Sequence, residues 1–421
     1  MLARSHSEDR AAEMGRSMKG ESAAGSNGCE EAGPALRRTV ALWPLIFYGL
    51  SDIIGAGIYV AIGQVLARSG AAAPIAFLLA GATAGLTGLC YAALASRFPE
   101  AAGAASYVKR VFRSDLLAQL VGGTVALSVA ITTAAIASGA VHYLVTLVNL
   151  SDSVLIAASV LCFTGIAVAG VRETVSVAVI LGLIEIGGLL MAVAAGFRSA
   201  AKIDLLSMVP VTASGWSGAV AGAFIAFFAF LGFETMANMA EEVKDARRIV
   251  PRAILGAIGT SILLYMLVAV VVTAADRSGD NPLLDLFQGR NATIFAAASA
   301  LAVANGVLVG IVTLARLFYG MACNGELPAI LGSVSARTRT PIVATLAAGG
   351  FILTTALLFP FEHLLVWTNA LTLVVFFAVD VALWRLQHSR VAAEEDFDIP
   401  HAIAPLAAMV ALALLAAELL G

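Results

Sequence analysis

Residues 51–60 read SDIIGAGIYV and residues 226–235 read AFFAFLGFET, and both stretches lie inside long apolar segments. Each stretch places glycine near a carboxylic acid, which is Asp52 in the first and Glu234 in the second. Glycine destabilises a helix by about 1 kcal/mol relative to alanine. An acid at the centre of a membrane helix costs roughly 3 kcal/mol on insertion scales. Paired interruptions of this kind indicate inverted repeats with a binding site where the interrupted segments meet.

The composition of the 421-residue chain is typical of a membrane protein. Hydrophobic residues make up 60% of the chain and charged residues 13%, whereas soluble domains have about 45–50% and about 25%. Apolar runs of about twenty residues recur, which is the length that a helix needs to cross the hydrocarbon core of a bilayer. We therefore predict an all-α polytopic membrane protein.

Eleven membrane spans are predicted, with boundaries set to within a few residues. The spans cover residues 43–66, 74–96, 116–148, 153–171, 174–197, 217–240, 253–275, 292–323, 341–359, 363–387 and 402–420. The third and eighth of them are longer than a span requires, so we expect these two to tilt or to project beyond the bilayer. Residues 1–38 are polar, mixed in charge and without an apolar signal-peptide core, and are predicted to form a disordered cytoplasmic tail.

The distribution of Lys and Arg between the loops orients the chain, because positive residues concentrate on the cytoplasmic side of a membrane. With a cytoplasmic N-terminus, sixteen Lys and Arg residues lie at the cytoplasmic face. Five lie outside, namely Arg68, Arg198, Lys202, Arg277 and Arg290. We expect a multi-pass protein of the cytoplasmic (inner) membrane with its N-terminus inside, and eleven spans then place Gly421 outside.

Charge, cysteines and motifs exclude several classes of protein. The formal net charge of −3 leaves no basic surface for nucleic acid. The four cysteines lie far apart, so neither a metal site nor a disulfide framework is indicated. No phosphate-binding, metalloprotease or serine-hydrolase motif is present, and no nucleophile–base pair stands at membrane depth. We therefore expect no cofactor, no metal, no nucleic-acid partner and no enzymatic activity.

The two interruptions suit opposite charges. A helix break at Gly55–Gly57 would start a second half-helix near Ile58, whose free N–H groups and positive dipole end can bind a carboxylate. The alternative is that these small residues serve close helix packing. A break around Phe230–Gly232 would free carbonyl groups that suit an ammonium group. Together the breaks fit a zwitterion, with the aromatic residues before Gly232 covering its side chain.

Four acids stand within predicted spans, namely Asp52, Glu185, Glu234 and Asp380. Such residues are functional candidates because their insertion into a membrane is costly. Burial favours the neutral form of a carboxyl group, so Asp52, Glu185 or Glu234 can carry a proton or bind a substrate cation. The alternative is a hydrogen-bonded structural acid. Asp380 lies near the cytoplasmic end of its span, where we expect it to pair with Arg385.

Several stretches resemble signatures of the amino acid–polyamine–organocation permeases. They are IIGAGIYV (53–60), AFFAFLGFETMANMAEEVKDARRIVPRAI (226–254), ARLFYGMACNGELP (315–328), FPEAAGAASYVKRVF (98–112) and GVRETVSV (170–177). The resemblance runs from about residue 41 to residue 420. It implies a LeuT-type 5+5 inverted repeat with discontinuous spans 1 and 6 and alternating access. The repeats would be residues 39–200 and 201–390, followed by an additional span in 391–421.

The resemblance also implies site residues. The family's substrate carboxylate meets the backbone at positions that match Gly55, Ala56 and Gly57, and its amino group meets carbonyls that match Ile53, Phe228 and Leu231. The sequence departs from the family pattern in lacking a twelfth span. Ala315 stands where a serine often precedes the arginine of span eight, which weakens the case for sodium. Glu185 stands where several members place a lysine.

The function implied is secondary transport of amino acids, driven by a proton or by exchange. The partners are then a small-molecule amino acid, the lipid bilayer and a possible proton. One alternative is an amine or polyamine carrier in which Asp52 or Glu234 binds the substrate cation. Another is a substrate sensor derived from a permease, which binds without net flux.

Overall fold

The computed structural model describes residues 40–98, 103–169, 175–201, 204–275, 281–335, 340–388 and 397–420. The predicted tail (1–38) and the first part of the 170–177 motif lie outside the described residues. Within the described part of the chain the structure is helical, and its β pairing is a single parallel bridge between Val40 and Val243.

Each of the eleven predicted spans corresponds to helix. The elements are α2 (Leu42–Ile54), α3 (Ala56–Ser69), α4 (Ala73–Arg97), α5 (Ala104–Phe112), α6 (Asp115–Leu147), α7 (Asp152–Ala169), α8 (Val175–Ala200), α9 (Ala213–Ala226), α10 (Thr235–Asn238), α11 (Ala246–Ala274), α12 (Arg290–Cys323), α13 (Ile342–Leu358), α14 (Phe361–His388) and α15 (Ile403–Leu420). The first span consists of α2 and α3, and the sixth of α9, a short 3₁₀ helix η3 (Phe227–Phe230) and α10. The discontinuity of both spans is therefore confirmed.

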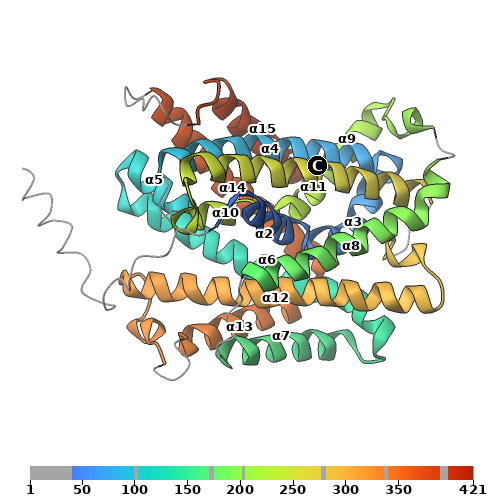
Figure 1. The fold of residues 1–421 in the computed structure, drawn as a ribbon, viewed down its shortest axis with the longest axis horizontal. Coiled ribbons are helices and arrows are strands. Elements are labelled where there is room, and N and C mark those ends of the chain that lie inside the picture. Colours follow the sequence, from blue (N-terminus) through green and yellow to red (C-terminus); the bar gives the residue numbers. More distant parts are fainter. Residues whose placement is uncertain are drawn as a thin grey trace, which may run out of the picture.

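The two longest helices exceed the thickness of a bilayer. Helix α6 has 33 residues and α12 has 34, which at 1.5 Å per residue is about 50 Å, whereas the hydrocarbon core is about 30 Å thick. In Figure 1, α12 runs across almost the whole width of the molecule. Large apolar side chains are exposed on several helices, among them Leu161, Leu263 and Met409, each at least 60% exposed. An all-α polytopic membrane protein accounts for such surfaces, because lipid covers them.

Helices that are five spans apart pack against each other around the broken first span. Helix α4 packs on α11, α6 on α12, α7 on α13 and α3 on α9. Figure 1 shows α2 near the centre, with α4 and α11 on one side and α12, α13 and α7 on the other. The discontinuous spans thus lie in the interior, where neighbouring helices can satisfy their freed backbone groups.

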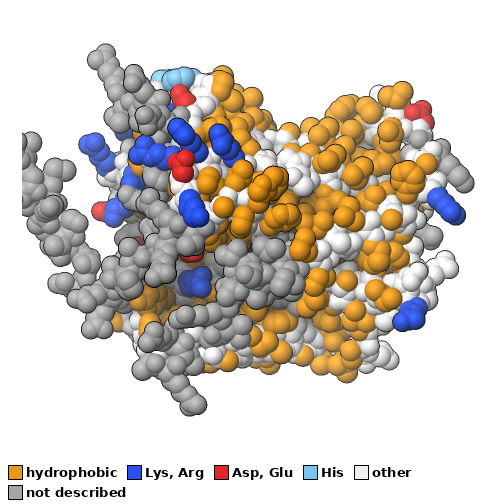
Figure 2. Space-filling model, viewed as in Figure 1, with side chains coloured by type: hydrophobic (Ala, Val, Ile, Leu, Met, Phe, Trp, Pro, Cys, Tyr) orange, Lys and Arg blue, Asp and Glu red, His pale blue; other side chains and the backbone are white. Residues whose placement is uncertain are grey.

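Basic side chains gather at one end of the molecule. In Figure 2, Lys and Arg side chains cluster at the end where α5 lies, hydrophobic side chains cover the middle, and few charges are seen at the opposite end.

The eleventh span, α15, is connected to the rest of the structure by an ion pair near each of its ends. Arg97 of α4 pairs with Asp398 at 3.0 Å, and Arg68 of α3 pairs with Glu418 at 3.5 Å.

Candidate functional site

The first span breaks at Gly55. Helix α2 ends at Ile54 and α3 begins at Ala56, so the second half-helix starts two residues earlier than predicted. No side chain caps the N-terminus of α3, and its first N–H groups have no partner within the helix. A Cβ on Gly57 would lie 2.8 Å from Cα of Ala229, closer than such atoms approach. The glycine therefore serves close packing of the two broken spans, and it keeps the helix end free of side chains.

The sixth span unwinds after η3. Leu231 is extended, Gly232 has φ +117° and α10 starts at Thr235. The side chain of Glu234 turns back, and its Oε2 accepts a hydrogen bond of 3.0 Å from the N–H of Gly232. A Cβ on Gly232 would lie 2.9 Å from the carbonyl carbon of Asp52. The unwound segment thus lies directly against the end of α2.

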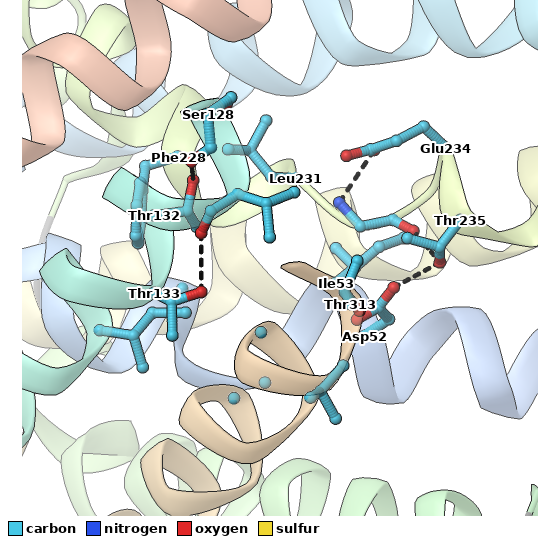
Figure 3. A pocket seen from close by; sticks show the side chains of 18 of the residues that line it. Asp52, Ile53, Ser128, Thr132, Thr133, Phe228, Leu231, Glu234, Thr235 and Thr313 are labelled. Carbon is cyan, nitrogen blue, oxygen red and sulfur yellow. Dashed lines mark hydrogen bonds between the residues drawn. The ribbon is translucent and has the colours of Figure 1, made fainter. Parts of the chain in front are cut away.

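Three side chains connect the two breaks or bind their freed carbonyls. Thr235 Oγ1 donates to the carboxylate of Asp52 and lies 2.7 Å from the carbonyl oxygen of Gly232 (Figure 3). The Tyr265 hydroxyl of α11 lies 2.8 Å from the Ile53 oxygen and 2.9 Å from the Ala229 oxygen. Asn369 of α14 donates to the Phe224 oxygen at 2.7 Å. Unwound backbone is tolerated at this depth because protein groups bind it.

A cavity of about 150 Å³ lies where the two breaks meet. Its lining includes seven of the residues predicted from the sequence, namely Asp52, Ile53, Gly55, Gly57, Phe228, Leu231 and Glu234. The backbone of Ala56 begins α3 beside them, and its side chain lies outside the described residues. Their roles stay predictions, but the structure brings these positions together.

Helices α6, α12 and α14 complete the cavity with polar side chains that the sequence does not single out. They are Ser128, Thr132 and Thr133 from α6, Asn305 and Thr313 from α12, and Thr372 from α14. Figure 3 labels Ser128, Thr132, Thr133 and Thr313. Thr132 and Thr133 each donate to a backbone oxygen one turn earlier at 2.7 Å. Their oxygens therefore remain as acceptors. Among the described residues that line the cavity there is no Lys, Arg or His.

Asp52 and Glu234 line the cavity, but Glu185 does not. It is 1% exposed on α8, and its Oε1 accepts a hydrogen bond of 3.3 Å from Nδ2 of Asn305. Its backbone oxygen accepts the hydroxyl of Tyr59 at 2.6 Å. The carboxyl group is thus connected to the cavity through the Asn305 amide.

The predicted pair between Asp380 and Arg385 is wrong. Asp380 is fully buried, accepts a hydrogen bond of 3.1 Å from Thr87 and lies beside the thiol of Cys90. Arg385 lies over the ring of Phe112 at 5.0 Å. Five residues along a helix separate two side chains by about 140°, so Asp380 faces α4 while Arg385 faces α5.

A second cavity of about 90 Å³ adjoins the first on the side of α5. The two cavities share Ser128, Val129, Glu234 and Thr372. At the other end, buried aromatic rings of α3, α6 and α12 pack together, with Tyr59 and Tyr143 6.2 Å apart and Tyr143 and Phe295 6.4 Å apart. The site therefore continues toward the basic end of the molecule, and aromatic packing covers the opposite side.

Comparison with known proteins agrees with this architecture. The sequence model of the amino acid permease family matches residues 40–419. The chain is 30% identical over 334 residues to cationic amino acid transporter 9, chloroplastic, of Arabidopsis thaliana, covering 72% of this chain and 58% of that protein. It is 28% identical to cationic amino acid transporter 4, vacuolar, of the same plant, covering 84% of this chain and 64% of that protein.

A bacterial relative matches over more of its own length. The methylthioribose transporter of Bacillus subtilis is 28% identical over 410 residues, which are 87% of this chain and 85% of that protein. The chain spans less than two thirds of the length of the two plant relatives. The match to the family covers nearly all of the described helices, and the chain therefore belongs to the amino acid permease family.

Proposed function

We propose that the chain is a secondary transporter of amino acids that works by alternating access and is not an enzyme. The observation that carries the proposal is the cavity at the crossing of two broken spans, with the free N-terminus of α3 on one side and acceptor groups on the other. A helix N-terminus attracts anions, and carbonyl and carboxylate oxygens attract ammonium groups. The substrate carboxylate binds at Gly55–Gly57, and its amino group binds near the carbonyls of Ile53, Phe228 and Leu231.

Amino acids with a cationic side chain are the favoured class. Asp52 and Glu234 both line the cavity, the hydroxyl groups of α6 present acceptor oxygens, and no basic side chain of the described lining competes for them. The plant relatives are named cationic amino acid transporters, which supports this preference. An amine or polyamine carrier would use the same acids without needing the N-terminus of α3.

A second candidate substrate is a neutral polyol such as methylthioribose. The many acceptor groups of the cavity also suit hydroxyl donors, and the methylthioribose transporter matches this chain over most of both sequences. A polyol has no carboxylate for the N-terminus of α3, which is why the amino acid remains the first proposal.

We propose a proton as the coupling ion, carried by Glu185 together with Asp52. The single hydroxyl hydrogen of Thr235 faces two acceptors, Asp52 and the carbonyl of Gly232. If Asp52 is protonated, its O–H donates to Oγ1 of Thr235. The hydroxyl hydrogen of Thr235 can then donate to the carbonyl of Gly232, so both contacts become hydrogen bonds. We expect Glu185→Gln to keep substrate exchange but to lose accumulation driven by a pH gradient, and unchanged pH dependence would contradict this assignment.

The packing of helices five spans apart supports two inverted repeats, in residues 39–200 and 201–390, with residues 391–421 as an added span. Rocking of one group of spans against the other would open the cavity alternately. The basic end of the molecule supports a cytoplasmic N-terminus in the inner membrane. A cytoplasmic N-terminus also places the second cavity on the route to the cytoplasm.

Uptake into proteoliposomes tests the proposal. Purified protein is reconstituted and supplied with labelled L-arginine, L-leucine, cadaverine or methylthioribose under an inward proton gradient. Accumulation of L-arginine supports a cationic amino acid as the substrate if L-lysine inhibits it and cadaverine, the decarboxylated analogue of lysine, does not. Uptake of cadaverine alone would indicate an amine carrier, and uptake of methylthioribose would indicate a polyol carrier. Ligand-dependent thermal stabilisation without any flux would identify a sensor.

A further inference from the structure

A corner at the basic end of the molecule brings together the end of α5, the start of α6 and the end of α14. Arg113 follows α5 with φ +53°, and its N–H donates to the Lys109 oxygen at 2.8 Å, so the chain turns sharply there before α6 begins. From α14, the guanidinium group of Arg385 lies over the ring of Phe112 at 5.0 Å. Both arginines are exposed. Two arginines that are far apart in sequence therefore adjoin the same phenylalanine.

Neither Arg113 nor Arg385 has a carboxylate partner among the described residues. The acid that lies next to them in sequence, Asp115, pairs instead with Lys109 at 2.8 Å. The other ion pairs of the described helices belong to arginines elsewhere in the fold. A guanidinium group over an aromatic ring keeps its N–H donors at its edge, where they can bind two oxygens of one anion. The corner thus offers positive charge that no acid of the described structure neutralises.

An apolar stripe on α6 begins directly beside these arginines. Leu116 and Leu120 in its first two turns are 66% and 58% exposed, and Leu127 is 41% exposed. At 100° per residue, these leucines and Gly123 lie within about 60° of one another around the helix. A Cβ on Gly123 would meet no atom within 4 Å, so the described protein does not fill the space beside it. The stripe is therefore open to a partner from outside the chain.

The change from arginine to leucine sets the level of the bilayer boundary at this corner. Lipid covers exposed leucines in a membrane protein, whereas exposed guanidinium groups stay at the level of the head groups. Trp384, the residue before Arg385, is 45% exposed, and tryptophan is enriched at that level. Arg113 precedes Leu116 by only three residues, so the head group and an acyl chain of one phospholipid can contact both.

We propose that this corner binds an anionic phospholipid of the adjoining leaflet. The phosphate group binds to Arg113 and Arg385, and an acyl chain lies along Leu116, Leu120 and Leu127. Charge-assisted hydrogen bonds from the two arginines hold the phosphate oxygens. A zwitterionic phospholipid binds more weakly, because its amine brings a positive charge next to the arginines. The ligand class is thus a phosphodiester lipid without an amine, such as phosphatidylglycerol.

Two other occupants fit the corner less well. A free phosphate ion would bind the arginines but leave the leucine stripe uncovered. A second copy of the chain could cover the stripe, but a symmetric dimer brings the same patch of both copies together. The arginines of the two copies would then face each other without a described acid between them, and like charges oppose association.

Native mass spectrometry of the purified full-length chain tests the proposal, with dioleoyl phosphatidylglycerol or dioleoyl phosphatidylcholine added in increasing amounts. The two lipids have the same acyl chains, so a difference in affinity reports the head group. An arginine near an anionic lipid surface is worth about fivefold in affinity. We therefore expect the parent protein to prefer phosphatidylglycerol by about 25-fold. Arg113→Gln and Arg385→Gln should each lower the preference to about fivefold, and the double variant should bind both lipids equally.

Arg198→Gln is the matched control. Arg198 is an exposed arginine in the last turn of α8, without an ion pair in the described structure, and its variant should keep the parent's preference. If Arg385→Gln does not purify as a monodisperse species, Arg113→Glu replaces it. That variant changes a side chain that is exposed, and it should abolish the preference for the anionic lipid.

Four results would overturn the proposal. The double variant could keep the parent's preference, or Arg198→Gln could lose as much of it as Arg113→Gln does. Inorganic phosphate could displace phosphatidylglycerol at equal concentration, which would indicate a plain anion site. The parent could form dimers that bind neither lipid, which would assign the stripe to a second copy. None of these results bears on the transported substrate, because the corner lies apart from the cavity residues.

Discussion

Replacing Gly232 by alanine should destabilise the crossing of the two broken spans. Its φ of +117° lies in a region that costs a non-glycine residue about 1–3 kcal/mol. The added Cβ would also lie 2.9 Å from both the carbonyl carbon and the oxygen of Asp52. These are backbone atoms that cannot rotate away, and overpacking of this kind costs about 1–3 kcal/mol more. We therefore expect a total loss of about 2–6 kcal/mol.

The assay is thermal unfolding of the purified protein in detergent, together with uptake into proteoliposomes. At about 2–4 °C per kcal/mol, the loss corresponds to a fall in Tm of at least about 4 °C. Uptake should fall as well, because separating Gly232 from Asp52 moves the carbonyls and the acid that line the cavity.

Gly85→Ala is the matched control. Gly85 lies within α4, and a Cβ there would meet no atom within 4 Å. Alanine in place of a helical glycine is stabilising by roughly 0.5–1 kcal/mol, so the Tm of this variant should be unchanged or slightly raised. If the two variants unfold at the same temperature and transport equally, the argument from backbone conformation and close contact at Gly232 is wrong.

Three further changes test the contacts around the site. The single hydroxyl hydrogen of Tyr265 is shared by two buried carbonyls, so Tyr265→Phe should cost about 1–3 kcal/mol in thermal unfolding. Tyr107→Phe removes a buried hydroxyl that has no hydrogen-bond partner in the described structure and should cost nothing; equal losses would contradict the assignment. Thr235→Val should weaken substrate binding about tenfold, because it removes the donor to Asp52 and frees the unwound segment; unchanged calorimetric affinity would refute this. Arg68→Gln should change the unfolding free energy by less than about 1 kcal/mol, since the arginine is 44% exposed in its ion pair; a larger loss would show that α15 depends on this contact.

The discontinuous spans and their acids could be predicted because each depends on contiguous residues. The glycines at 55 and 57 and at 232, the neighbouring carboxyl groups and the length of each apolar run are all properties of short stretches of sequence. The free energy of inserting such a stretch into lipid depends on its own composition. The apolar segments and the breaks in the first and sixth of them therefore followed from local information, and so did the choice of backbone positions that meet at the cavity.

The side chains that complete the site could not be predicted in this way. Polar and apolar residues are not segregated to separate faces of helix α6, so no amphipathic pattern shows that Ser128, Thr132 and Thr133 face inward. In a soluble protein, the face of a helix that contacts water carries polar residues, so the sequence shows which face is outside. In a bilayer, lipid and protein interior are equally apolar, and the sequence does not distinguish them.

Contacts across the fold account for the remaining differences from the sequence-based expectations. Tyr265 and Asn369 bind carbonyls that lie tens to hundreds of residues away in sequence, and Asn305 meets Glu185 only because α12 packs on α8. Proximity in sequence predicts Arg385 as the partner of Asp380, but the rotation of the helix turns Asp380 toward α4. Local sequence thus determined where the chain enters the membrane and where its helices break, since both depend on the transfer of short segments into lipid. The packing of helices distant in sequence determined which polar groups meet at the breaks.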